Sequence, residues 1–432
     1  MRYNSVALAR GLSLRILHTS DWHLGHTLHD LSRWREHDAF LEWLTDTLGS
    51  ESVDVMLLTG DIFDSANPSA RSTQRWFSFL AEVRRRYPAL DLIVVGGNHD
   101  SAARMDAPRP ILESMNIHIL GGLPRHANGA VKLDEVIIPI TGRSGDVEGW
   151  VAAVPFLRPG DLPRVSSEAA TAEGRLVAGM RTLYQQLIGA LQERRQDGQA
   201  AVVTGHCLMA GAMLSENSER KIQGGNQDAL PADLFTNDLT YVALGHLHLA
   251  QAVGRDTVRY AGSPLPLSMT EAGYAHQVNV IDVEGGKVVS QRALETPRII
   301  EMFRIPADGP APLDVVMPLV KALPERGEDV EEDTLPFVEV RISLEQPIPG
   351  LRRQVQEAMA DRAARLVKLT VAFTGDGDAL ADAVLVERLR DIQPEEVFVR
   401  RYQRDHDGDP PPPLLSSFHE LLNQVLQQGG AK

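Results

Sequence analysis

The sequence predicts a layered α/β fold in which helices flank two sheets, followed by a small α+β domain and a C-terminal helix. Three observations support this prediction. Short apolar runs alternate with segments of helical periodicity over the first half of the chain. Several of these runs stop at a glycine that is followed by Asp, Asn or His. The chain has 432 residues of ordinary globular composition, enough for roughly two or three domains.

Composition and charge exclude several classes of protein. No run of about 18 apolar residues occurs, so no membrane-spanning helix is expected. The first residues include Arg10 and Arg15 and lack the apolar centre of a secretory signal, which favours a cytoplasmic protein. Cys207 is the only cysteine, so an intrachain disulfide and a cysteine-rich zinc site are excluded. The formal net charge of -15 means that a nucleic-acid substrate would need a local basic or metal-rich surface, or a partner that supplies one.

The first part of the chain predicts repeated βα units. The expected elements are, in order, strand 14–18, helix 31–48, strand 55–58, helix 70–86 and strand 92–95. Between 116 and 156, short segments bounded by glycine predict strands that suit the second sheet of a sandwich: IHIL, GAVKL, VIIPI and WVAAVPF. The elements expected after them are a helix at 171–195 and strands at 200–203, 240–244, 258–260 and 277–283.

Beyond about Pro297 the pattern changes to that of a small α+β domain. The segments IIEMFRI, FVEVRISL and LVKLTVAF alternate with helices expected near 351–360 and 379–390. The run DHDGDPPPP predicts a linker, because consecutive prolines favour extended geometry and cannot continue a helix. We therefore divide the chain into an N-terminal extension (1–13), a main domain (14–296), an α+β domain (297–404), a proline-rich linker (405–413) and a final helix (414–432).

The final helix has an apolar face and little core of its own to join. The residues on this face are Leu414, Leu415, Phe418, Leu421, Leu422, Val425 and Leu426. We favour docking on a partner protein, with Leu415, Phe418, Leu422 and Val425 as the contacting residues. Packing back onto this chain is the alternative that stays open.

Residues of metal-binding type follow five of the expected strands. They are Asp21 and His23; Asp61 and Asp64; Asn98, His99 and Asp100; His206; and His246 and His248. Taken singly, each is also explained as a turn, loop or core residue. Five such groups at the carboxyl ends of strands in one α/β domain make coincidence a poor explanation.

These side chains are imidazoles, carboxylates and an amide, without a thiolate, which suits manganese, zinc or iron. About seven ligands are too many for one ion, so we expect two divalent ions. A carboxylate that bridges two ions, together with a shared water, is an arrangement for in-line attack on a phosphorus ester.

The motifs DWH, GDIFD, GNHD, TGH and GHLH, in this order, resemble those of the calcineurin-like metallophosphoesterases. The flanking segments LRILHTSDWHLG, LLTGDIFD, GGNHDS, VPFLRP, ALGHLHLAQ and RYAGSPLPLS are similar to those of the SbcD family of nuclease subunits in bacterial DNA repair. The resemblance is dense from about Leu14 to Ser268 and weaker in the α+β domain. It implies a layered metallophosphoesterase sandwich with a capping domain that shapes access of DNA.

The resemblance also implies a role for each residue that matches a motif. One ion would be held by Asp21, His23, Asp61 and His248. The other would be held by Asp61, Asn98, His206 and His246, so that Asp61 bridges the two. His99 resembles the catalytic histidine of the family, which stabilises the transition state or protonates the leaving oxygen. Asp64 and Asp100 would orient imidazoles, with turn hydrogen bonding as the open alternative.

Family membership would imply a particular activity and particular partners. The activity is exonuclease action on double-stranded DNA ends and endonuclease action on hairpins and single strands, in DNA repair, recombination and replication. The metal would be Mn²⁺, and the partner an SMC-like ATPase subunit, SbcC. A homodimer within a heterotetramer, located in the cytoplasm at the nucleoid, is implied as well.

Two alternatives stay open. The first is a dimetal phosphatase or nucleotide phosphodiesterase of the same superfamily. Protein phosphatases of this superfamily typically follow the second motif with Arg and Gly and the third with Glu, whereas Ser65 follows Asp64 here and Asp100 follows His99. The second alternative is an inactive scaffold, which the intact ligand set opposes. His26 and Arg158 lie near the motifs and are explained at this stage as solvated loop residues.

Overall fold

The computed structural model describes residues 13–142, 145–163, 172–213, 229–327 and 329–374, with a few residues between 398 and 418. The chain divides into two compact units. The first contains most of the chain up to Phe303 together with Asp329–Phe337, and the second contains Arg304–Glu328 and the chain from Val338 onward. Among the described residues, no helix is long and apolar enough to cross a membrane.

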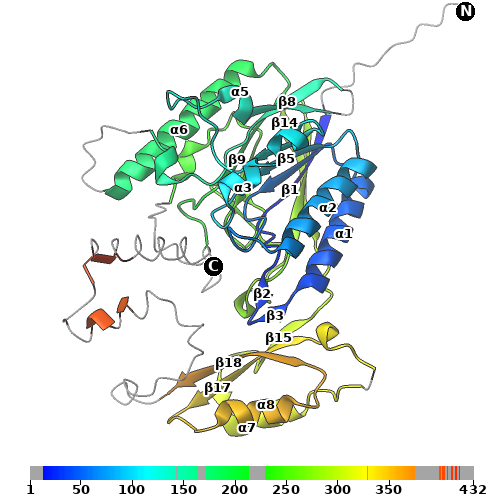
Figure 1. Ribbon diagram of the computed structural model, residues 1–432, viewed down its shortest axis with the longest axis vertical. Helices are drawn as coiled ribbons and strands as arrows, with labels where there is room; N and C mark the ends of the chain where they lie inside the picture. The colour runs from blue at the N-terminus through cyan, green and yellow to red at the C-terminus, as the bar shows by residue number, and fades with distance from the viewer. Residues whose placement is uncertain are drawn as a thin grey trace, which may run out of the picture. The chain divides into compact units, whose positions relative to one another are not determined.

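The first unit contains two six-stranded sheets (Figure 1). The first sheet has the order β14 (Lys287–Glu295), β13 (Gln277–Glu284), β1 (Ser13–Thr19), β4 (Val55–Thr59), β5 (Asp91–Val95) and β6 (Ile117–Leu120). Strands β1, β4, β5 and β6 are parallel, whereas β13 and β14 are antiparallel to their neighbours. The carboxyl ends of β1, β4 and β5 therefore lie at one edge.

The second sheet also has a parallel centre. Its order is β11 (Gln251–Val253), β12 (Arg255–Tyr260), β10 (Tyr241–Gly245), β9 (Ala200–His206), β8 (Val147–Ala152) and β7 (Ile137–Thr141). Strands β8, β9, β10 and β12 are parallel, and the edge strands β7 and β11 are antiparallel. The carboxyl ends of β9 and β10 consequently face the same way.

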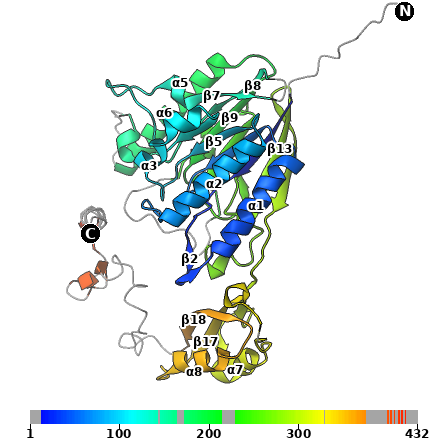
Figure 2. The same ribbon diagram turned by 45° about the vertical axis from the view of Figure 1, so that its right-hand side comes forward.

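Alternation along β4 explains how the layers pack. Val55 and Leu57 belong to an apolar cluster shared with the second sheet. Met56 and Leu58 point the other way and join a cluster with α1 (Trp34–Ser50) and α2 (Ala70–Arg86), which lie side by side over the first sheet (Figures 1 and 2). This two-residue period is expected of a strand buried on both faces.

Helices cover both sheets. The helix α6 (Ala172–Arg194) packs against the second sheet and buries Leu183 and Leu187 (Figure 2). The short elements of this unit are β2 (Thr27–Leu28), β3 (Leu31–Ser32), α3 (Ala102–Asp106), α4 (Arg109–Glu113) and α5 (Leu133–Val136). The predicted helices at 70–86 and 31–48 are confirmed, although α1 begins and ends slightly later than expected.

Two expectations for the region 116–156 are wrong. The segment IHIL forms β6 of the first sheet and not part of the second. The segment GAVKL forms no strand, because a turn from His126 to Ala130 closes at Gly129, whose φ is 85°. Leu133 at its end already begins α5. Only the segments that became β7 and β8 joined the second sheet as expected.

The second unit is of the α+β type. Its sheet contains β15 (Met302–Ile305), β17 (Phe337–Leu344) and β16 (Ala311–Pro312), with β18 (Arg365–Phe373) paired to β17. Among its described residues, the helices that accompany the sheet are α7 (Leu313–Lys321), which the sequence analysis did not predict, and α8 (Leu351–Met359). The helix expected at 379–390 lies outside the described residues, as do most of the linker and of the final helix. The proposed domain boundaries remain a prediction.

Candidate metal centre

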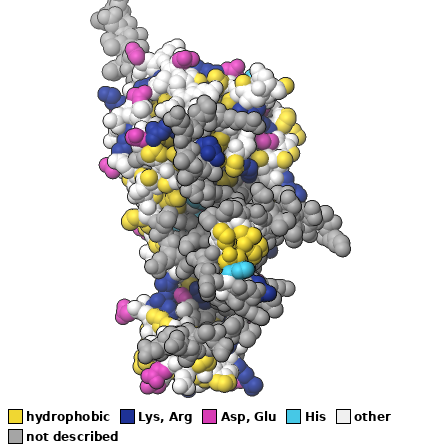
Figure 3. All heavy atoms as spheres, turned by 90° about the vertical axis from the view of Figure 1, so that its left-hand side faces the viewer, with side chains coloured by type: hydrophobic (Ala, Val, Ile, Leu, Met, Phe, Trp, Pro, Cys, Tyr) yellow, Lys and Arg dark blue, Asp and Glu magenta, His cyan; other side chains and the backbone are white. Residues whose placement is uncertain are grey.

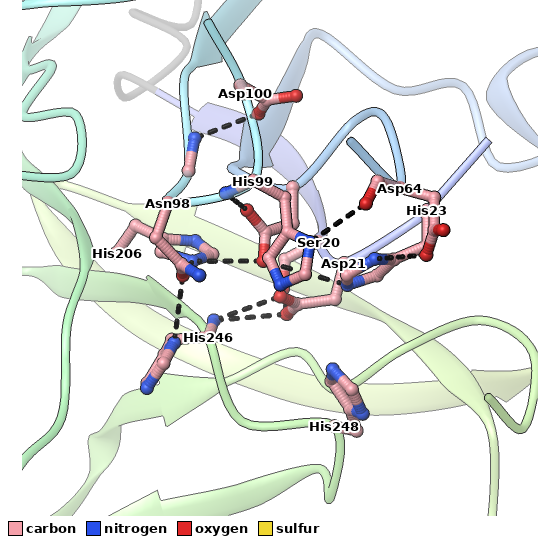
Figure 4. Close-up of polar contacts among 12 residues, drawn as sticks. Ser20, Asp21, His23, Asp64, Asn98, His99, Asp100, His206, His246 and His248 are labelled. Carbon is pink, nitrogen blue, oxygen red and sulfur yellow. Dashed lines mark hydrogen bonds and ion pairs between the residues drawn. The ribbon is translucent and has the colours of Figure 1, made fainter. Parts of the chain in front are cut away.

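The five predicted groups of polar residues meet where the two sheets face each other (Figure 4). Loops after β1, β4 and β5 contribute from the first sheet, and β9 and β10 contribute from the second. Backbone hydrogen bonds join the loops, from His23 N to Asp61 O at 3.0 Å and from Asp21 N to Gly60 O at 3.0 Å. The positions of the side chains are therefore set by the sheets themselves.

The backbone is strained at several of these positions. Asp21, His23, Asp61 and His246 have φ values of 54°, 46°, 49° and 104°. Residues other than glycine rarely adopt positive φ values of this kind, and such outliers cluster at functional sites. Each of the four carries a predicted metal ligand, so the strain coincides with the predicted chemistry.

Glycines let the two sheets approach closely behind the ligands. A Cβ atom at Gly60, whose φ is 97°, would lie 2.1 Å from His206 Nδ1. At Gly245 it would lie 1.9 Å from the carbonyl oxygen of Thr59. Gly60 after β4 and Gly245 at the end of β10 are thus required by contacts between the sheets, and Gly60 also by its positive φ.

Three overlapping groups of side chains could hold a metal ion: Asp21, His23 and His248; His23, Asp61 and His99; and Asp21, Asp61 and His206. Within each group the ligand atoms lie within 4.8 Å of one another. Asp21, His23 and Asp61 each belong to two of the groups. Asp61 is a buried carboxylate with imidazoles on two sides, 3.6 Å from His23 Nε2 and 3.4 Å from His206 Nε2, which suits a ligand common to two ions.

One half of the centre consists of Asn98, His206 and His246. Nδ1 of His206 donates to the carbonyl oxygen of Thr59 at 2.9 Å, which leaves Nε2 directed at Asn98 Oδ1, 2.8 Å away. Asn98 Oδ1 is also 3.2 Å from His246 Nδ1, so the amide lies between the two rings (Figure 4). These atoms converge as the ligands of one ion would.

The other half consists of Asp21, His23 and His248. His23 Nδ1 lies 3.3 Å from Asp64 Oδ1 and Nε2 lies 3.6 Å from Asp61 Oδ2. Neither nitrogen makes a hydrogen bond of good geometry, although the residue is only 3% exposed. Buried polar atoms are normally satisfied, so this imidazole fits a metal ligand.

The pKa values follow from burial and from the close imidazoles. Burial alone would raise the pKa of Asp61, but His206 and the neighbouring histidines hold it well below its usual value. Burial would lower the pKa of His206, but Asp61 raises it to about 9. Burial and the charge of His206 lower the pKa of His246 to about 3. Large pKa shifts of this kind, produced by burial together with close charged partners, are typical of a functional site.

His99 lies beside both halves. Its backbone N–H donates to Asp61 Oδ1 at 2.8 Å, and its Nδ1 donates to the carbonyl oxygen of Asp64 at 2.9 Å. The ring is half-buried and lies against that of His23, with 4.8 Å between centroids. Nε2 is therefore the nitrogen left for proton transfer.

Comparison with known proteins identifies the family. Residues 14–250 match the calcineurin-like phosphoesterase family, and residues 300–406 match the type 5 capsule protein repressor C-terminal domain. The D subunit of nuclease SbcCD from Rhodobacter capsulatus is 36% identical over 401 residues, which cover 90% of this chain and 94% of that protein. The chain belongs to the SbcD family.

Two further SbcD proteins are similar to this chain. The Escherichia coli protein of the same name is 31% identical and covers 90% of this chain and 92% of its own length. The Bacillus subtilis protein is 31% identical over 63% of this chain and 67% of its own length. Membership confirms the predicted fold class and enzyme class: this is a phosphoesterase of a nuclease-subunit family, a class that uses divalent metal ions.

Asp64 and Asp100 differ in what they touch. Asp64 Oδ1 contacts the rings of His23 and His26, the latter at 3.0 Å, as expected for a residue that orients imidazoles. The carboxylate of Asp100 instead accepts from the backbone N–H groups of Ile62, Phe63 and Gly97, at 3.1, 3.0 and 2.9 Å. Burial and the charge of Asp61 raise its pKa to about 6. In this SbcD chain, Asp100 thus joins two motif loops and does not touch an imidazole in the described contacts.

Two residues near the centre have contacts that sequence analysis did not predict. Glu271 Oε1 lies 3.1 Å from His248 Nδ1, yet Glu271 follows none of the five strands. Arg158 Nη2 donates to the carbonyl oxygen of Asp100 at 3.1 Å, and its guanidinium lies over the ring of Phe156. The only signal for Arg158 was its place within the segment VPFLRP, and no sequence signal pointed to Glu271.

Proposed function

We propose that this chain is the dimetal-dependent nuclease subunit of a DNA-processing complex. It cuts double-stranded DNA ends as an exonuclease and hairpins or single strands as an endonuclease, with Mn²⁺ as the metal. It works with an SMC-like ATPase, SbcC, as a homodimer within a heterotetramer, in the cytoplasm at the nucleoid. The relatives named above are subunits of the SbcCD nuclease, which supports the proposal.

The observation that carries the proposal is the convergence on Asp61. Its Oδ2 atom lies 3.6 Å from His23 Nε2 in one half and 3.4 Å from His206 Nε2 in the other. We assign Asp21, His23, Asp61 and His248 to one ion, and Asp61, Asn98, His206 and His246 to the other. Two ions held in this way supply an activated water and neutralise charge on the phosphate.

The protein's own residues then orient the substrate and move a proton. Because the Asp64 carbonyl accepts from His99 Nδ1, the second ring nitrogen of His99 is the one left to act on the substrate. That nitrogen can donate a hydrogen bond to a phosphate oxygen or a proton to the leaving oxygen. Asp100 keeps the loop that carries Asn98 and His99 against the loop that carries Asp61.

The acidic net charge of the chain favours a local contact with DNA over binding through a broad basic face. The net charge is -15. On the face drawn in Figure 3, Lys and Arg side chains are scattered among acidic and hydrophobic ones. Phosphates would be met mainly by the metal centre and by residues close to it, and the ATPase would supply further contacts.

Cleavage of a DNA hairpin by the purified chain with Mn²⁺, alone and with SbcC, tests this function. We expect cutting that disappears on chelation and returns with Mn²⁺. Activity limited to nitrophenyl phosphate or to nucleotides would instead support the phosphodiesterase alternative. Absence of all three activities, with both ions bound, would support the scaffold.

The role of His99 is tested by His99→Leu. We expect hairpin cleavage to fall by about 100-fold or more, as for loss of a general acid, while bound metal stays close to two ions per chain. Metal analysis and cleavage are measured on the same samples. A large loss of metal would mean that His99 is a ligand, as its place beside His23 and Asp61 also allows.

Association with the ATPase is assigned to Leu415, Phe418, Leu422 and Val425 of the final helix, of which Leu422 and Val425 lie outside the described residues. Phe418 stacks on Phe398 with 4.3 Å between ring centroids, so packing on this chain is a real alternative for it. Deleting 414–432 should abolish co-purification with SbcC and spare metal binding. An intact complex would refute the assignment.

A further inference from the structure

Behind the candidate centre lies a buried carboxylate with no assigned role. Glu271 ends a short 3₁₀ turn, Met269–Glu271, and its side chain is 0% exposed. Oε1 lies 3.1 Å from His248 Nδ1, while Oε2 accepts from the backbone N–H of Leu267 at 2.8 Å. Both oxygens are thus engaged, one by a proposed ligand and one by the main chain.

We propose that Glu271 is a positioning residue that keeps the proton of His248 on Nδ1 and so directs Nε2 of this ring to the metal ion. A carboxylate only accepts hydrogen bonds, so the nitrogen facing it must carry the hydrogen. The other nitrogen is then the one with a lone pair for a metal. The inference rests on the proposed function insofar as His248 is a ligand.

The carboxylate is itself held in place by its turn. Ser268 Oγ donates to Oε1 at 3.2 Å, and the Glu271 carbonyl oxygen accepts from the Tyr274 N–H at 2.8 Å. Arg298 Nη1 donates to the next carbonyl, that of Ala272, at 2.7 Å. The side chain of Glu271 therefore cannot turn away from His248 without breaking its bonds to Leu267 N–H and Ser268 Oγ, and the backbone bonds fix the turn that carries it.

The equivalent contact in the same half of the centre is weaker. Asp64 lies 3.3 Å from His23 Nδ1, and its side chain is 35% exposed, whereas that of Glu271 is fully buried. Solvent therefore screens the charge of Asp64 more than that of Glu271, so Glu271 should be the more important of the two.

The first measurement needs no substitution. In the metal-free full-length protein labelled with ¹⁵N-histidine, the ring shifts of His248 should show the proton on Nδ1. His248→Gln assigns the signals. A proton on Nε2 of His248 in the wild type would overturn the proposal.

The decisive variant is Glu271→Gln. If its amide oxygen still accepts from Leu267 N–H, its NH₂ group must face His248 Nδ1, which forces the proton to Nε2. We expect the ¹⁵N pattern to switch and Mn²⁺ affinity at one of two sites to fall about 10- to 100-fold by calorimetry. Unchanged affinity together with an unchanged proton position would refute the proposal.

A matched control separates positioning from a merely structural role. Ser268→Ala removes a hydroxyl from the same turn and leaves the carboxylate facing His248. It should keep the affinity for Mn²⁺, and an equal loss in both variants would mean that only the turn matters. In the His248→Gln background, Glu271→Gln should cost no further affinity, whereas additive losses would contradict action through His248.

These readouts are independent of cleavage. A protein with the expected proton position and two Mn²⁺ sites that leaves DNA intact would contradict the proposed function and keep the role of Glu271. Conversely, hairpin cleavage by Glu271→Gln with wild-type metal affinity would contradict only the role of Glu271.

Discussion

The two halves of the candidate centre place their imidazoles by different means. In one half, His206 is held by a main-chain carbonyl, that of Thr59 at the end of β4. In the other half, His23 and His248 are held by side-chain carboxylates, at 3.3 Å from Asp64 and 3.1 Å from Glu271. The first arrangement comes with the sheets, and the second depends on individual side chains.

This difference predicts how each half fails. A change in the spacing of the two sheets should damage the half with His206, because its partner is backbone from the opposite sheet. A single carboxylate substitution should damage only the half with His23 and His248. Loss of Asp61, which we assign to both ions, should affect both halves.

The largest effect is expected for Asp61→Asn. An amide cannot supply the negative charge that Asp61 presents to His23 and His206, so both ions should be lost. We expect cleavage to fall by more than about 100-fold, beyond the cost usual for residues that only support ligands. Metal analysis checks this, with Asp134→Asn, whose side chain is 97% exposed, as the control. One ion retained at full affinity would argue against a shared ligand.

Gly60→Ala should damage mainly the half with His206. The new Cβ would lie 2.1 Å from His206 Nδ1, in a residue whose φ is 97°. We expect about one ion per chain and a loss of about 1–3 kcal/mol in the free energy of unfolding. Gly129→Ala is the matched control, since its φ is 85° and no atom lies within 4 Å of the new Cβ. Equal effects would mean that backbone strain, not the His206 contact, is responsible.

A third prediction concerns how the stability of the junction between the two sheets depends on pH. His18 joins them next to Thr59, with Nδ1 3.0 Å from Tyr241 Oη and Nε2 3.0 Å from Thr59 Oγ1. Burial and the charge of Arg259 lower its pKa from 6.5 to about 3. Between these values the unfolded chain binds the proton and the folded chain does not, so stability falls as pH falls.

The loss should be up to about 1.4 kcal/mol per pH unit for this one group. Urea unfolding of the metal-free protein between pH 7 and pH 5 measures it. His18→Gln should show a slope that is smaller by up to that amount, because it has no imidazole to titrate. Equal slopes in the two proteins would show that His18 is not kept neutral by the fold.

The strand-end residues could be predicted because their signal is local. An apolar run followed by Gly60 and Asp61, or by Gly245 and His246, marks both the end of a strand and the predicted ligand beyond it. The parallel order of the strands then brings these ends to one edge. The fold class was predictable for the same reason, since alternating strands and helices repeat along the chain.

The remaining contacts could not be predicted because they join segments distant in sequence. Glu271 lies in a turn that does not follow any of the five strands with predicted ligands. Its partner, His248, is 23 positions earlier in the sequence. Asp100 binds backbone N–H groups of Ile62 and Phe63, which have no sequence signature. The segment GAVKL has the composition of a strand, but Gly129 turns it back on itself. The ligand roles of the predicted residues stay a prediction until metal is measured.

The smallest effect is expected for Asp64→Asn, in the half that depends on carboxylates. Its side chain is 35% exposed, and its backbone carbonyl, which holds His99, is unchanged by the substitution. Burial would raise the pKa of Asp64, but its contacts with the imidazoles of His23 and His26 hold it well below its usual value, so the residue is charged at neutral pH. Loss of this charge should weaken Mn²⁺ binding by roughly 10-fold or less, the lower end for a supporting residue. Calorimetry of Mn²⁺ binding to Asp64→Asn and to Glu271→Gln, measured under the same conditions, ranks the two carboxylates. A larger loss of affinity in Asp64→Asn would mean that burial does not decide which carboxylate matters more.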